Sequence, residues 1–210
     1  MYKKLQYISQ GNTIEAQLYN IQKALDSGCD WIQLRFKTKN TTDLVTLAKA
    51  VKEICSSYKA TLIINDNVYL AQQIAADGVH LGLTDMGIPE ARRILGADKI
   101  IGATANTFED ILTHVQNTAN YIGLGPFQFT TTKQKLSPIL GLEGYRSTLQ
   151  KLRQQQVKIP IYAIGGITSE NVEPLMDTGI HGIAVSGLLT HSDNPTELIK
   201  HLNEKLYVTI

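Results

Sequence analysis

The stretch TLIINDNVYLAQQIAADGVHLG, residues 61–82, shows the pattern that decides the fold. It contains two apolar runs of strand length, TLIIND and GVHLG, and the segment between them predicts a helix that begins near Val68. Neither run alternates strictly between apolar and polar residues, which is typical of strands that are covered on both faces. The stretch therefore predicts one strand–helix–strand unit of an α/β protein.

The same unit recurs along the whole chain, at intervals of roughly 20 to 30 residues. The apolar runs are LQYIS (5–9), WIQLRF (31–36), TLIIND (61–66), GVHLG (78–82), IIGAT (100–104), YIGLGP (121–126), PIYAIGG (160–166) and GIAVSG (182–187). Eight strand–helix repeats predict a closed parallel (β/α)8 TIM barrel, with residues 1–210 as a single domain. The alternative is a doubly wound open sheet, but the first run lacks the glycine-rich GxGxxG turn that usually follows in that fold.

The segments between the strands carry helix signals. Thr107 predicts an N-cap, and Gly179 predicts the end of a helix that Ser169 and Glu170 open. After Asn40, the apolar residues of the next segment fall on one helical stripe: Leu44, Leu47, Ala48, Val51 and Ile54. No linker or low-complexity tract interrupts the alternation, so no domain boundary is expected.

The composition is that of a globular protein without a dominant charge. Apolar residues make up 43% of the 210 residues, and 20 basic residues balance 19 acidic ones to a net charge of +1. No basic field exists that would attract nucleic acid or anionic lipid, so neither is expected as a partner. Any anion must therefore be bound locally.

Several further features indicate a cytoplasmic location. The N-terminal MYKKLQYIS has no long apolar core or small-residue cleavage site, and no apolar run is long enough to span a bilayer. Cys29 and Cys55 lie beside no metal or redox motif, so we expect both to be packing residues in a reduced compartment. The sequence leaves open whether the protein is a homo-oligomer.

Basic side chains follow the second predicted strand, at the barrel end where chemistry is expected. Alternation places Gln33, Arg35 and Lys37 on one side of this strand. If that side faces the interior, two cations meet at the mouth of the barrel, where burying them unpaired is costly. They could form salt bridges with barrel carboxylates or bind an anionic substrate, and the residues alone favour neither.

Acidic side chains follow the next two strands. The third run ends in Asn65 and Asp66, and Asp85 follows the fourth. Because consecutive strands are neighbours in a barrel, these two carboxylates would repel unless a cation lies between them. That cation could be a basic residue of the second strand or Mg²⁺, which binds one or two carboxylates together with water and phosphate oxygens. The alternative for Asp66 is an N-cap of the helix near Val68.

The polar residues of the fourth and fifth strands are less informative. His80 lies within the fourth run, where a lone histidine is more typical of a satisfied core group than of a catalyst. The fifth run ends in the small or neutral residues Thr104, Ala105 and Asn106. A catalytic role of His80 is the alternative to this core role.

Two further regions of the predicted mouth suit phosphate groups. The sixth strand opens into GPFQFTTTKQK (125–135), where Thr130, Thr132 and Lys133 can donate to phosphate oxygens. Gly166 and Ser186 follow the seventh and eighth strands, where barrels often bind a phosphate. The charged region suits a pyrophosphate and the neutral one a single phosphate, which indicates an enzyme that joins or exchanges two phosphorylated small molecules.

Seven motifs resemble the thiamine phosphate synthase family, in order over nearly the whole chain. They are QLRFK, LIINDN, ADGVHLGLTD, IIGATANT, GLGPFQFTTTK, IPIYAIGGIT and GIAVSG. The resemblance implies a transferase of thiamine biosynthesis that uses Mg²⁺. It would couple 4-amino-2-methyl-5-hydroxymethylpyrimidine pyrophosphate with 4-methyl-5-(2-phosphooxyethyl)thiazole, giving thiamine phosphate and pyrophosphate. In that family the pyrophosphate leaves first, and the thiazole nitrogen captures the resulting cation.

The resemblance also implies roles for individual residues. Asp66 and Asp85 would bind the metal, and Arg35, Lys37 and Lys133 would be catalytic. Substrate binding would involve these three basic residues together with Gln33, Asn65, Thr104, Thr130, Thr132, Gly166, Val185 and Ser186. No general base is required, because the attacking nitrogen carries no proton.

The chain departs from the family pattern at five positions. Asn67 replaces a usual Arg, Leu83 a Gln, Asn106 a His, Phe129 a Pro and Thr104 a Ser. The alternatives are a related thiazole tautomerase or a non-catalytic regulator that binds thiazole or thiamine phosphate. A tautomerase resembles a site with a histidine where this chain has Asn106, which cannot act as a general base. A regulator would be expected to lose the metal or lysine residues that this chain keeps.

Overall fold

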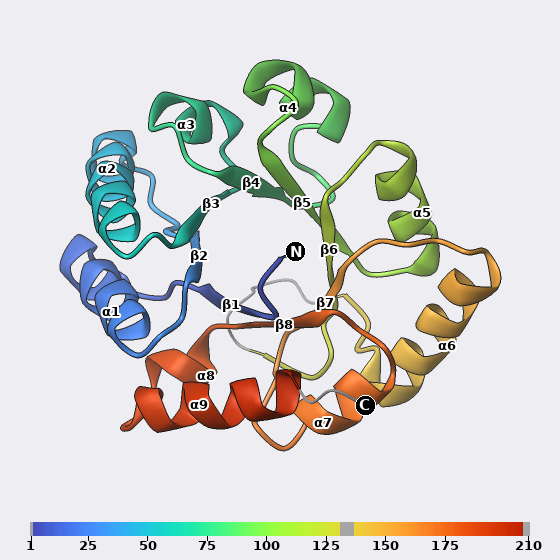
Figure 1. Ribbon diagram of the computed structural model, residues 1–210. Helices are drawn as coiled ribbons and strands as arrows, with labels where there is room; N and C mark the ends of the chain where they lie inside the picture. Colours follow the sequence, from blue (N-terminus) through green and yellow to red (C-terminus); the bar gives the residue numbers. More distant parts are fainter. Residues whose placement is uncertain (1, 131–136, 208–210) are drawn as a thin grey trace.

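The computed structural model describes residues 2–130 and 137–207, and its eight parallel strands form a closed barrel (Figure 1). The strands are β1 (Leu5–Ile8), β2 (Trp31–Leu34), β3 (Thr61–Asn65), β4 (Gly78–Leu81), β5 (Ile100–Ala105), β6 (Tyr121–Leu124), β7 (Ile161–Ile164) and β8 (Gly182–Val185). Each strand pairs with the next, and β8 returns to β1 through the pair Leu5 and Ile183. The predicted (β/α)8 barrel is confirmed and the open sheet is excluded.

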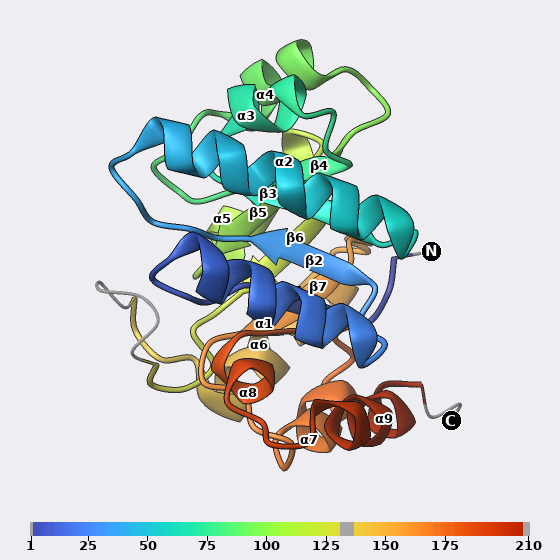
Figure 2. The ribbon, with the colours of Figure 1, turned by 90° about the vertical axis from the view of Figure 1, so that its left-hand side faces the viewer.

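The helices cover the outside of the strand ring (Figures 1 and 2). They are α1 (Ile14–Asp26), α2 (Thr41–Ser57), α3 (Val68–Gln73), α4 (Ile88–Leu95), α5 (Phe108–Gln116), α6 (Gly141–Gln154), α7 (Val172–Asp177), α8 (Gly187–Thr190) and α9 (Pro195–Leu206). In the part of the chain that is described, no helix has the length and apolar character to cross a membrane.

The predicted helix boundaries are confirmed in two places and wrong in a third. Thr107 caps α5 in a capping box with Asp110, and Gly179 follows α7 with a φ of 91°. The helix expected at Ser169 begins only at Val172. The reason is a local turn, in which the backbone N–H and hydroxyl of Thr168 both donate to Asn171 Oδ1 at 3.1 and 2.8 Å.

Two hydrophobic cores hold the barrel together. The larger core lies between the strands and the helices, and the predicted stripe of α2 contributes Leu47, Ala48 and Val51 to it. The two cysteines are also buried and unbridged as expected, and burial raises the pKa of each thiol to about 12. These thiols therefore stay protonated and act as packing groups.

A second core fills the amino half of the barrel interior. It consists of Trp31, Ile63, Tyr121 and Tyr162, all at most 1% exposed, with Tyr2 packed against them. The Trp31 ring lies edge-on to Tyr121 and Tyr162, with ring centroids 5.3 and 5.1 Å apart. Edge-to-face contacts of this kind contribute about 0.5–1.5 kcal/mol each beyond area burial. This aromatic core separates the amino end from the mouth.

Candidate active site

Asp66 and Asp85 meet at the mouth, at the ends of two adjacent strands. Their carboxyl groups lie within hydrogen-bond reach of each other, so the pair shares a proton when the pH is below about 6. Burial raises the pKa of Asp66 to about 6, with further increases from the hydrogen bond and the charge of Asp85. Asp85 Oδ2 also accepts from Gly82 N at 2.6 Å. The predicted meeting of these two carboxyl groups is therefore seen in the structure.

The backbone at the end of β3 turns Asp66 toward this position. Asp66 has a φ of 64°, a left-handed conformation that non-glycine residues adopt mainly when they are Asn or Asp. Its N–H donates to His80 O at 2.8 Å. The suggested capping role of Asp66 is wrong, because Asn67 caps α3 by accepting from Leu70 N at 2.9 Å. Asn67 thus has a structural role at a position where the sequence departs from the family pattern.

Arg35 and Lys37 follow β2, the strand that pairs with β3. Arg35 is half-buried and Lys37 is exposed, and neither forms an ion pair with any carboxylate in the described part of the chain. Burial lowers the pKa of the Arg35 guanidinium, and the nearby charge of Asp66 opposes that effect. The alternative of a permanent salt bridge is therefore not what the structure shows. The two cations remain available to an anion.

Two buried polar side chains hold the backbone of Arg35, and sequence reasoning missed both. Arg35 N donates to Ser9 Oγ at 2.9 Å, and Gln17 Nε2 donates to Arg35 O at 3.2 Å. Ser9 and Gln17 are each 1% exposed. Gln17 lies on the buried face of α1, and a glutamine on an apolar helical face is the signal that could have identified it.

The donor set at Asp66 and Asp85 fits a divalent cation. Above a pH of about 6 the two carboxyl groups are ionised and repel each other, and a bound cation would offset that repulsion. No cluster of three or more His, Cys, Asp or Glu residues occurs among residues 2–130 and 137–207. Two carboxylates with open positions fit Mg²⁺, which keeps water and phosphate oxygens as its remaining ligands.

The neutral region lies at the ends of β7 and β8. Gly166 has a φ of 70°, and a Cβ there would lie 2.7 Å from Phe129 O, so both the conformation and the close contact favour glycine. Val185 is buried, and Ser186 is half-buried and donates to Gln10 Oε1 at 3.4 Å. Since Ile164 pairs with Ala184, Gly166 and Ser186 stand at the same level of two neighbouring strands.

The remaining predicted residues have different outcomes. Gln33 is 2% exposed and lies inside the barrel, below the mouth, while Asn65 and Thr104 are half-buried. Thr130 is also half-buried. Thr132 and Lys133 lie outside the described residues.

Asn106 connects the end of β5 to its surroundings. Its Nδ2 donates to Gly125 O, and its Oδ1 accepts from Ser137 Oγ at 2.8 Å. Both ends of the amide are therefore used, and an amide cannot exchange protons as a general base does. This geometry does not suit the tautomerase alternative.

A family model described as thiamine monophosphate synthase matches residues 5–189. The chain belongs to the thiamine monophosphate synthase family. The match contains all eight strands, the paired carboxyl groups and the neutral region.

Similar proteins support this membership of the thiamine monophosphate synthase family. The chain is 66% identical over 210 residues to a thiamine-phosphate synthase of Flavobacterium johnsoniae, covering 100% of this chain and 99% of the relative. It is 46% identical over 198 residues to one from Bacteroides fragilis, covering 94% and 97%. A solved thiamine phosphate pyrophosphorylase of Pyrococcus furiosus superposes with a TM-score of 0.83 at 31% identity, covering 97% and 96%. The protein is thus a transferase of thiamine biosynthesis with thiamine-phosphate synthase activity.

Proposed function

We propose that the mouth of the barrel couples 4-amino-2-methyl-5-hydroxymethylpyrimidine pyrophosphate with 4-methyl-5-(2-phosphooxyethyl)thiazole. The products are thiamine phosphate and pyrophosphate. The observation that carries the proposal is the closely spaced pair of Asp66 and Asp85 beside Arg35, which has no carboxylate partner among the described residues. In such a site the two carboxyl groups would bind a metal ion, and the cation would bind the highly charged anion that accompanies the metal.

The charged region would bind the pyrophosphate of the pyrimidine substrate. Asp66 and Asp85 would hold Mg²⁺, which supplies positive charge that stabilises the leaving pyrophosphate. Arg35 and Lys37 would bind its oxygens from the adjacent strand end, and Lys133, which follows β6 in the sequence, would contribute a further cation. Charge-assisted hydrogen bonds are about twice as strong as neutral ones, so these contacts gain strength as negative charge develops on the pyrophosphate.

The chemistry then needs one bond to break and one to form. The C–O bond to the pyrophosphate breaks, and its electron pair leaves with the oxygen. The resulting cation is stabilised by the pyrimidine ring, and the thiazole nitrogen uses its lone pair to form the new C–N bond. No proton moves in either step, which agrees with the two occupied ends of the Asn106 amide.

The neutral region would bind the phosphate of the thiazole substrate. Gly166, Val185 and Ser186 can offer backbone N–H groups and a hydroxyl there, as phosphate sites in such barrels do. The two anion sites lie on different sides of one mouth. Each substrate can therefore place its ring toward the centre.

The decisive experiment mixes the purified protein with both phosphorylated substrates and measures pyrophosphate release with and without Mg²⁺. We expect release that requires both substrates and the metal. No release of pyrophosphate, combined with binding of the thiazole phosphate, would favour the tautomerase or regulator alternatives.

A further inference from the structure

A chain of hydrogen bonds crosses the interior of the barrel and ends at the mouth. Gln33 Nε2 donates to Gln6 Oε1 at 3.2 Å, and Gln6 Nε2 donates to Tyr121 Oη at 3.2 Å. Tyr121 Oη lies 3.0 Å from His80 Nδ1, and His80 Nε2 lies 3.0 Å from Thr104 Oγ1. The first four residues are at most 5% exposed, and Thr104 is half-buried. Five strands therefore contribute to one polar connection.

Two glycines make room for this chain. A Cβ at Gly102 would lie 2.1 Å from the Tyr121 ring, and one at Gly123 would lie 3.1 Å from the His80 ring. Real Cβ atoms do not approach other atoms as closely as the first distance, so Gly102 is required for the position of Tyr121. The space for the chain is thus built into β5 and β6.

The donors and acceptors give the chain a direction. Gln6 and Gln33 both donate to Tyr121 Oη, so its two lone pairs are used and the single phenol proton is left for His80 Nδ1. Burial raises the pKa of Tyr121, so the phenol keeps that proton. An accepting Nδ1 places the imidazole proton on Nε2, which donates to Thr104 Oγ1. The Thr104 hydroxyl then has its own proton to donate farther toward the mouth.

We propose that Gln6, Tyr121 and His80 are positioning residues that hold the Thr104 hydroxyl as a hydrogen-bond donor to a ring nitrogen of the pyrimidine substrate. The inference rests on the proposed function of the same mouth. All members of the chain are uncharged in this arrangement, and the basic and acidic residues lie at the rim. An uncharged heteroaromatic ring suits this place better than a phosphate, because a phosphate needs charge compensation. A donor selects for an unprotonated ring nitrogen.

The direction of the hydrogen bonds along the chain can be measured by NMR, without measuring turnover. The ¹⁵N NMR spectrum of the wild-type protein should show His80 with an unprotonated Nδ1 and a protonated Nε2, and loss of these signals in His80→Gln would assign them. Tyr121→Phe removes the donor to Nδ1 and should change this tautomer balance. A protonated Nδ1 in the wild type would mean that the chain runs the other way, and that result overturns the proposal.

Kinetics provide the second readout. Tyr121→Phe should raise KM for the pyrimidine substrate about fivefold, the effect of one neutral hydrogen bond, and leave KM for the thiazole phosphate unchanged. Tyr162→Phe is the matched control, since Tyr162 belongs to the same aromatic core but donates to Lys3 O at 2.5 Å. Equal KM values in the two variants would contradict the proposal.

A double-variant cycle separates a positioning role from a general loss of packing. Thr104→Val keeps the shape and removes the hydroxyl, so adding Tyr121→Phe to it should raise KM no further. Thr104→Ser should retain the wild-type KM. Additive effects would overturn the proposal. An inactive wild-type protein would instead contradict the proposed function, while the NMR spectrum would still decide the direction of the chain.

Discussion

The two ends of the barrel differ in the partners of their charged side chains. At the amino end, Lys3 pairs with Asp30 at 2.7 Å, and Lys52 lies 3.6 Å from Asp77. At the mouth, Arg35 has no carboxylate partner in residues 2–130 and 137–207. Cations without a carboxylate partner also occur at the amino end, but there Lys99 Nζ donates to Ala76 O at 2.7 Å. A half-buried cation without a partner costs stability, so Arg35 indicates that the mouth receives an anion.

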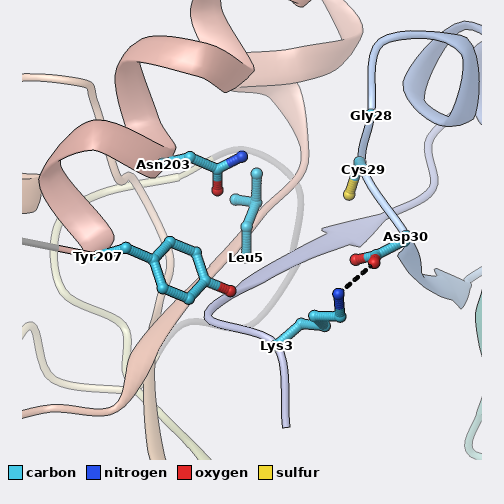
Figure 3. A pocket seen from close by; sticks show the side chains of 7 residues that line it. All are labelled: Lys3, Leu5, Gly28, Cys29, Asp30, Asn203 and Tyr207. Carbon is cyan, nitrogen blue, oxygen red and sulfur yellow. Dashed lines mark ion pairs between the residues drawn. The ribbon is translucent and has the colours of Figure 1, made fainter.

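Figure 3 shows the amino end at close range. A cavity of about 260 Å³ lies between the start of β1, the loop before β2 and the end of α9. Lys3 and Asp30 point toward each other there, while Asn203 lies on α9 and Tyr207 directly follows that helix. The cavity is polar, but its two charges already satisfy each other. A cavity alone therefore does not identify the active site, whereas a charged side chain without a partner is a more specific indicator.

The largest expected effect comes from removing a carboxylate at the mouth. Asp85→Asn should reduce Mg²⁺-dependent turnover by at least about 100-fold, because the metal loses one of its two proposed protein ligands. Turnover is measured as pyrophosphate release over a range of Mg²⁺ concentrations. Asp98→Asn is the matched control, since Asp98 is exposed and precedes β5 at the amino end. Equal rates for both variants would remove Asp85 from the metal site.

The unpaired cation should have the next largest effect. Arg35→Gln should lower kcat/KM for the pyrimidine pyrophosphate by about 10- to 100-fold, the range expected for a hydrogen bond to a charged group. Arg93→Gln serves as the control, because Arg93 is exposed and only lies 3.9 Å from Glu90 one helical turn away. A wild-type value in Arg35→Gln would mean that the mouth is no more sensitive to charge than the outer surface.

The Asp66–Asp85 pair should make stability depend on pH. The folded-state pKa of Asp66, about 6, exceeds its ordinary value of 3.8, so the folded protein binds more protons between these two values. In the metal-free protein, the free energy of unfolding should therefore fall as pH rises from about 4 to about 6. Chemical denaturation across this range tests the effect, and Asp66→Asn should flatten the slope. A slope that survives in Asp66→Asn would assign the dependence to other groups.

Addition of Mg²⁺ tests whether the same pair binds the metal. At pH 7 the metal should raise the unfolding midpoint of the wild-type protein, because it would offset the repulsion between the two ionised carboxyl groups. The same addition should have little effect on Asp66→Asn. A similar gain in both proteins would place the stabilising ion elsewhere.

The smallest effect should come from the paired charges of the amino end. Asp30→Asn should lower the free energy of unfolding by less than about 1 kcal/mol, as is typical of exposed ion pairs, and should leave turnover unchanged. Adding Lys3→Gln should produce little further loss. A clear decrease in turnover would show that the two ends are coupled, which would weaken the contrast between them.

The sequence predicts most of the architecture because strand runs and helix caps are local signals. It also predicts that Asp66 and Asp85 meet, since consecutive parallel strands lie side by side and end at the same edge. The start of α7 is missed because a turn competes with the helix signal at Ser169. The roles of the predicted site residues, Thr132 and Lys133 included, and the single-domain organisation remain predictions.

Contacts between residues far apart in the chain could not be predicted. Gln6 and Tyr121 are separated by 115 positions, and only the closed barrel brings them together. The contact of Ser9 with the backbone of Arg35 depends on the pairing of β1 with β2, and that of Gln17 depends on how α1 packs beside β2. Single polar residues in apolar surroundings mark such positions, but the sequence does not name their partners.

The aromatic core in the amino half of the barrel has a consequence for the evolution of the protein. Trp31, Tyr121 and Tyr162 form a floor beneath the mouth, and Tyr2 packs against it from the amino end. Loops at the mouth can change in length or acquire new side chains while this aromatic core keeps its packing. Substitutions at the mouth can therefore alter the activity of the protein during evolution while the barrel stays stable.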